Sequence, residues 1–176
     1  MKKLGNQGFS MIELLVVLLI IGVLAAVAAP LFLNNSAKAK ISEAVAGAGS
    51  IRAGERTYYS QNSSYYPANA SETSYFGTGG GNSSALGVTM HGNKYFSPNA
   101  YSVAVPGTWL ATVTGVTANP VDFTITVNGA NSQSLATDAT DGAANASEAA
   151  NFVVQMDNAG QTIYSTGGTG GTFSKY

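Results

Sequence analysis

One long apolar run dominates the first fifth of the chain. No charged residue occurs between Glu13 and Lys38, and residues 14–33 are apolar apart from the interruptions of one glycine and one proline. A helix of this length covers about 30 Å, which is enough to cross the hydrocarbon core of a bilayer. The pattern therefore predicts a membrane-spanning helix at about residues 9–34.

Beyond Asn35 the apolar positions recur at alternating intervals of four and three residues, which is the spacing of one face of a helix. This amphipathic pattern predicts that the helix continues to about Tyr59, with Glu55 interrupting its apolar face. Small residues at 44–49 would let either a neighbouring helix or the protein's own sheet approach closely. The positions of the predicted face are Ala37, Ile41, Ala44, Ala48, Ile51, Glu55 and Tyr58.

The last part of the chain changes to a period of two, which is typical of strands. Residues 101–105 and 121–127 alternate between apolar and polar side chains, and residues 158–160 form a predicted turn. We expect roughly four or five antiparallel strands packed against the helix, an α+β head. Further strand candidates are 109–116, 152–156 and 162–164, and the glycine-rich tail 167–171 is expected to be flexible.

A loop-like segment at about 60–98 separates the helix from these strands, and aromatic side chains are interleaved in it. Such rings could form an exposed adhesive surface or an electron-transfer stack, but packing onto the head is favoured because aromatic rings bury large areas. The rings concerned are Tyr58, Tyr59, Tyr65, Tyr66, Tyr75 and Phe76.

Composition narrows the possible functions. The chain has 176 residues, no cysteine and one histidine, His91, so disulfides and cysteine-ligated metal sites are excluded and no catalytic constellation stands out. Residues 61–176 contain two basic and six acidic side chains, whereas nucleic-acid binding needs a basic surface. We expect no enzyme activity, no cofactor, no metal and no nucleic-acid partner.

Glu13 is the most informative residue, because it lies at the head of the apolar run. An acid at the centre of a membrane helix costs roughly 2.5–3.5 kcal/mol, less near an end, so such a residue is expected to have a functional partner. The residues before it are Gly8-Phe9-Ser10-Met11-Ile12, and Lys2 and Lys3 form a basic leader.

This arrangement resembles the processing site of type IV prepilins and of the related pseudopilins of type II secretion. The resemblance implies a type IV pilin-like fold with a leader at 1–8, a stalk helix at 9–60 and a globular head at 61–176. It also implies cleavage between Gly8 and Phe9, methylation of the new Phe9 amine, and a contact of Glu13 with the Phe9 amine of a neighbouring subunit. Gly22 and Pro30 fall where the family often has helix-weakening residues.

The expected function is that of a structural subunit of a type IV pilus, held as a single-pass protein in the inner membrane and then assembled into an extracellular helical filament of identical subunits. The expected partners are the prepilin peptidase/methyltransferase and the inner-membrane assembly machinery. One alternative is a pseudopilin in a short periplasmic filament. A second alternative, of a different class, is a membrane-tethered binding domain, which would retain residues 1–8.

Overall fold

The computed structural model describes residues 9–67, 73–76, 85–90, 93–116, 121–132 and 150–176. The chain divides into two compact units, residues 1–38 and residues 39–176, so the second half of the long helix belongs with the head. The predicted leader 1–8 and His91 lie outside the described residues.

The predicted long helix is confirmed. Helix α1 runs without a break from Met11 to Asn62, through Gly22 and Pro30, a few residues beyond the predicted end. The stretch Met11–Ala29 is long and apolar enough to cross a membrane, with a mean hydropathy of 2.9 and none of its residues buried within the chain. This stretch lies close to the N-terminus, and a signal sequence in that position would have a similar length and composition.

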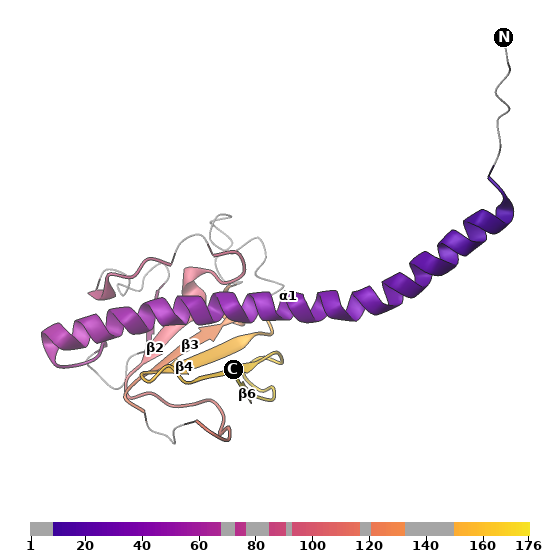
Figure 1. Cartoon of the computed structure of the whole chain (residues 1–176). Coiled ribbons are helices and arrows are strands. Elements are labelled where there is room, and N and C mark those ends of the chain that lie inside the picture. The colour runs from indigo at the N-terminus through magenta and orange to yellow at the C-terminus, as the bar shows by residue number, and fades with distance from the viewer. Residues whose placement is uncertain (1–8, 68–72, 77–84, 91–92, 117–120, 133–149) are drawn as a thin grey trace, which may run out of the picture. The chain divides into compact units, whose positions relative to one another are not determined.

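In its described residues, the head contains one antiparallel six-stranded sheet, in which each strand pairs with the next along the chain (Figure 1). Short helical segments η1 (Pro98–Ala100) and α3 (Gly129–Ser132) precede β2 and follow β3. The strands are β1 (Thr73–Tyr75), β2 (Tyr101–Ala104), β3 (Thr124–Asn128), β4 (Val153–Asp157), β5 (Thr162–Ser165) and β6 (Ser174–Lys175).

The α+β class and three of the predicted strands, now β2, β4 and β5, are confirmed, as is the turn after Asp157. The predicted strand at 121–127 begins only at Thr124, because Val121 forms an isolated bridge with Gly107 instead. The prediction of a strand at 109–116 is wrong. There, the Leu110 N–H donates to the Gln155 side chain at 2.7 Å, so a side chain replaces a neighbouring strand.

Two edge strands escaped prediction because they are too short to show alternation. Strand β1 has three residues and lies in the segment expected to be a loop, and β6 has two residues at the C-terminus. The glycine-rich tail before β6 contains a turn, in which the Gly171 N–H bonds to the Gly168 carbonyl, and the Gly168 N–H bonds to the Asn151 carbonyl at 2.7 Å.

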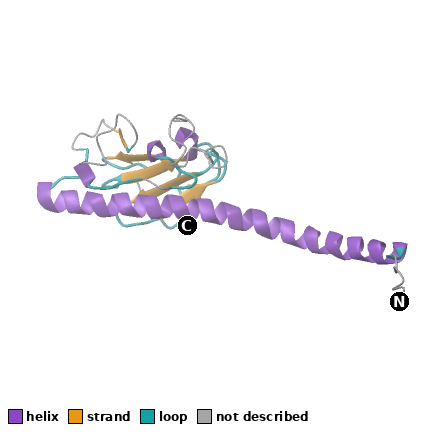
Figure 2. Ribbon diagram, turned by 90° about the horizontal axis from the view of Figure 1, so that it is seen from above, coloured by secondary structure: helices purple, strands orange, loops and turns teal. Residues whose placement is uncertain are grey.

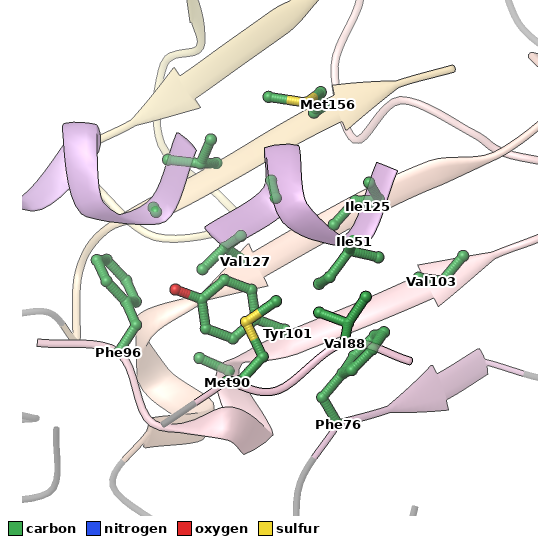
Figure 3. Close-up of a cluster of buried hydrophobic side chains, with 14 of the residues drawn as sticks. Ile51, Phe76, Val88, Met90, Phe96, Tyr101, Val103, Ile125, Val127 and Met156 are labelled. Carbon is green, nitrogen blue, oxygen red and sulfur yellow. The ribbon is translucent and has the colours of Figure 1, made fainter. Parts of the chain in front are cut away.

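The core of the head lies between the sheet and residues 39–62 of α1, which run alongside it in both views (Figures 1 and 2). The predicted helix face is confirmed, because Ile41, Ala44, Ala48 and Ile51 are buried against the strands. Figure 3 shows Ile51 of the helix in one cluster with Tyr101, Val103, Ile125 and Val127 of the sheet and with Phe76, Val88, Met90 and Phe96.

Glycine allows the helix and the sheet to meet closely at one point. A Cβ atom added to Gly47 would lie 2.5 Å from a ring carbon of Tyr101, whose side chain is fully buried. Among the small residues predicted to allow close approach, Gly47 therefore serves the protein's own sheet. Gly49, two residues on, meets nothing within 4 Å.

Aromatic packing is confirmed for the rings that the structure describes. Tyr59 stacks on Tyr65 with 4.5 Å between ring centroids, and Tyr65 meets Phe123 edge-on at 4.8 Å. Tyr58 and Tyr66 pack edge-on at 5.5 Å. Phe76 is buried in the core, while the side chain of Tyr75 lies outside the described residues.

Candidate assembly site

The residues that carry the prepilin resemblance lie at the start of α1. Phe9 and Ser10 precede the helix, and Glu13 is in its first turn. The Ser10 N–H donates to the Glu13 carboxylate with 2.9 Å between the nitrogen and Oε2. In the backbone, the Glu13 and Leu14 N–H groups both donate to the Ser10 carbonyl. Glu13 thus satisfies a backbone donor that would otherwise have no partner at the helix N-terminus.

This contact is one half of a capping box, in which Ser at the N-cap is followed three residues later by Glu. The sequence pattern Ser10-Met11-Ile12-Glu13 just before an apolar run is its signature, so the capping role could have been read from the sequence and was missed. A carboxylate in the first turn also interacts favourably with the positive end of the helix dipole. Glu13 therefore has a local structural task in the single chain.

The side chains around Glu13 offer an apolar surface rather than a catalytic pocket. Phe9 is 79% exposed and Met11 88% exposed, and the large apolar residues that follow are exposed as far as Phe32. Lipid or another apolar partner would bury this surface. Its only acid would then be desolvated, which is costly unless the carboxylate meets a cation.

The structure brings Phe9 and Glu13 to the same end of α1, whereas Gly8 lies outside the described residues. Cleavage after Gly8 would create an α-amine at Phe9, a cation in the same apolar surroundings. Glu13 Oε2 already accepts the Ser10 N–H, and a carboxylate has further lone pairs for an ammonium group. The arrangement suits charge pairing.

The two predicted weak points, Gly22 and Pro30, lie inside the unbroken helix. A Cβ added at Gly22 would meet nothing within 4 Å, so nothing else in the described chain requires a glycine there. Proline lacks the N–H that the helix ladder uses, and glycine lowers helix stability by roughly 0.5–1 kcal/mol relative to alanine. Their role as places where the helix yields remains a prediction.

The head has polar contacts that sequence reasoning did not identify. The Glu43 carboxylate accepts the N–H groups of Lys94, Tyr95 and Phe96 at 2.8–3.0 Å, and so fixes the segment before β2 to α1. Arg52 donates to the carbonyls of Asn158 and Ala159, both at 2.9 Å, in the β4–β5 turn. These residues lie far apart in the sequence from their partners, so no local pattern marks them.

Within the described parts of the chain, no three His, Cys, Asp or Glu side chains gather where they could hold a metal ion.

Comparisons with known proteins agree with the position of this site. A family model described as the prokaryotic N-terminal methylation motif matches residues 3–29. A type IV major pilin protein, PilA, of Myxococcus xanthus is 38% identical to this chain over 60 residues, which make up 34% of this chain and 27% of the relative. A fimbrial protein of Neisseria meningitidis is 40% identical over 64 residues, 36% of this chain and 37% of the relative.

The fimbrial protein EcpC of Eikenella corrodens is 42% identical over 60 residues, 34% of this chain and 39% of that protein. The chain thus matches less than two-fifths of the length of each of these relatives. No solved structure matches the chain significantly.

Proposed function

We propose that this chain, whose N-terminal segment is that of a type IV pilin, is a structural subunit of a type IV pilus. The observation that carries the proposal is the position of Glu13, the acid of the methylation motif, in the first turn of a helix whose large apolar side chains are exposed from Met11 to Phe32. Such a surface needs an apolar environment, and a bundle of identical helices supplies one.

Assembly follows from the chemistry of the helix start. A peptidase cleaves between Gly8 and Phe9 and so creates an α-amine, which the associated methyltransferase modifies without removing its charge. In the bundle, this ammonium group of one subunit meets the Glu13 carboxylate of a neighbour. Each charge is expensive to bury alone, so only a processed subunit completes the pair.

The membrane holds the subunit before assembly. Helix α1 would cross the inner membrane at about residues 9–34 as a single span, with the leader in the cytoplasm and the head outside it. Inner-membrane assembly machinery then moves the subunit into the filament. The relatives that match are major pilins and fimbrial proteins, which favours an extracellular pilus over a periplasmic pseudopilus.

Electron microscopy of cells with and without the gene product tests this function. We expect surface filaments that disappear when the gene is deleted, return when it is restored, and bind an antibody against the head along their length. Cells that carry the same filaments with and without the gene product, with the protein abundant in their membranes, would contradict the proposal.

A further inference from the structure

One carboxyl group is enclosed in the head between the last turns of α1 and the segment 63–67 that follows the helix. Glu55 has no exposed surface, and its Oε2 accepts the Tyr66 N–H at 2.9 Å. Its other oxygen, Oε1, is also buried and meets no hydrogen-bond donor among the described residues. A buried carboxylate normally has several donors or a cation, as Glu43 has on the same helix.

The cations nearest to Glu55 in the sequence have other partners. Arg52 donates to the carbonyls of Asn158 and Ala159, and Arg56 donates to that of Asn158 at 3.2 Å. Among the described residues, the titratable groups in this region are Tyr65, Tyr66 and Asp122 from the packed segments, with Tyr58 and Tyr59 on the helix itself. The Tyr65 hydroxyl has a raised pKa because it is desolvated and because it lies near the charges of Asp122 and Glu55, with Arg56 acting in the opposite direction.

Burial without a counter-charge favours the neutral form of Glu55. Desolvation raises the pKa of this carboxyl from 4.5 to about 7, although the Tyr66 N–H acts against the shift. The carboxyl is therefore mostly neutral below about pH 7 and mostly ionised above it.

The segment 63–67 folds back on the end of α1 and contacts it through aromatic rings and a backbone hydrogen bond. It begins at Ser63, whose φ of +54° lies in the left-handed region that non-glycine residues rarely adopt. Ring contacts then hold it, through Tyr66 on Tyr58 and through Tyr65 on Tyr59 and Phe123. The hydrogen bond from the Tyr66 backbone to α1 ends on Glu55 itself, so the carboxyl is in direct contact with the part that would move.

We propose that Glu55 is a pH-sensitive latch, which holds residues 63–67 closed on α1 while its carboxyl is neutral and releases them when the carboxyl ionises. Release lets water reach the carboxylate and uncovers the ring faces of Tyr58, Tyr65 and Tyr66. The latch is a property of the head alone and goes beyond the role of the subunit in a filament.

The direction of the effect follows from proton linkage. The Glu55 carboxyl has a higher pKa when residues 63–67 are closed on α1 than when they are open. The closed form therefore retains a proton that the open form loses more readily. The closed form is most stable below about pH 4.5, loses stability as the pH rises from there to about 7, and changes little above that range.

Hydrogen exchange of the full-length protein in detergent micelles, at pH 5.5 and pH 8.5, tests the latch. Protection factors, which remove the intrinsic pH dependence of exchange, are compared for peptides that cover residues 59–67. Between these two pH values we expect protection in wild type to fall on the order of tenfold, because the open form ionises first. The paired strands β3 and β4 serve as the internal reference and should keep their protection.

Two variants assign the effect. Glu55→Gln has nearly the same shape and cannot ionise, so its protection in this segment should be the same at both pH values. Glu43→Gln, which changes an acid on the same helix at a different contact, should keep the wild-type pH response. Equal protection of the wild-type segment at both pH values would overturn the proposal, as would a pH response that persists in Glu55→Gln.

Infrared spectroscopy of wild type covers the case in which Glu55→Gln does not fold. A protonated carboxyl has its own carbonyl absorption, and we expect one such band to disappear as the pH is raised through about 7. If all the carboxyl groups titrate below pH 5.5, the latch is excluded.

Discussion

The structure shows one task of Glu13, and we propose a second. In the single chain Glu13 accepts the Ser10 N–H and caps the helix. The pattern Ser10-Met11-Ile12-Glu13 predicts this role, but only the resemblance to prepilins was used to interpret Glu13. In the filament it is proposed to neutralise the amine of a neighbouring Phe9. Glu43 and Glu55 could not be predicted in the same way, because their partners lie on segments that only the tertiary fold brings to the helix.

Two variants separate the helix cap at Glu13 from its proposed charge pairing. Glu13→Gln retains an acceptor for the Ser10 N–H but has no charge, whereas Glu13→Val loses both. We expect both variants to insert into the membrane and to be processed, and both to lose most of their filaments, since removing one member of a buried ion pair costs about 3–5 kcal/mol. Immunoblots of sheared filament and membrane fractions measure this.

A wild-type yield of filaments from Glu13→Gln, with loss confined to Glu13→Val, would show that the cap matters and that the charge does not. A wild-type yield from both variants would show that neither interaction is needed for assembly.

At the scale of elements, the sequence predicted what has a regular pattern. The 3.6-residue period located α1 and its buried face, and alternation located β2, β4 and β5. The rest lacked a period. Strands β1 and β6 are too short to have one, and in the segment 109–116 the Leu110 N–H donates to the side chain of Gln155 rather than to a strand.

The contact between α1 and β2 predicts opposite effects for two neighbouring glycines. Gly47→Ala gains helix propensity but places a Cβ against the buried ring of Tyr101, and we expect it to lower the free energy of unfolding by about 1–3 kcal/mol. Gly49→Ala meets no atom and should raise it by about 0.5–1 kcal/mol. Denaturant unfolding of the unassembled protein in detergent, followed by tyrosine fluorescence, measures both. If the two variants shift the free energy of unfolding in the same direction, the close approach of Gly47 to Tyr101 does not exclude a larger side chain at position 47.

The stretch between Gly22 and Pro30 should behave differently in the single chain and in the filament. It is helical in the single chain, as expected, although Pro30 removes a backbone donor. We predict that it extends on assembly, which would lengthen the stalk and give the filament elasticity. Filament density at side-chain resolution decides this, since an unbroken helix through residues 22–30 would refute the extension while leaving the pilin interpretation intact.

At the scale of the whole molecule, the two compact units differ in how much their sequences reveal. The family match covers residues 3–29 and the relatives match over about a third of the chain, so the apolar helix carries the functional assignment. For the head, only the periodicity of apolar and polar residues predicted the fold class. The contacts of Glu43, Arg52 and Glu55 in the head join segments that are distant in the sequence, so no sequence motif marks them.

The central claim, that this chain is processed after Gly8 and then built into filaments, is tested most directly by the N-terminal mass of the protein in filaments sheared from cells. The account predicts that the filaments consist of this chain beginning at a methylated Phe9, and that Gly8→Glu leaves the full-length precursor in the membrane and no filaments. A chain that retains Met1 in the filaments, one that begins near Ala29, or filaments from which this chain is absent would contradict it.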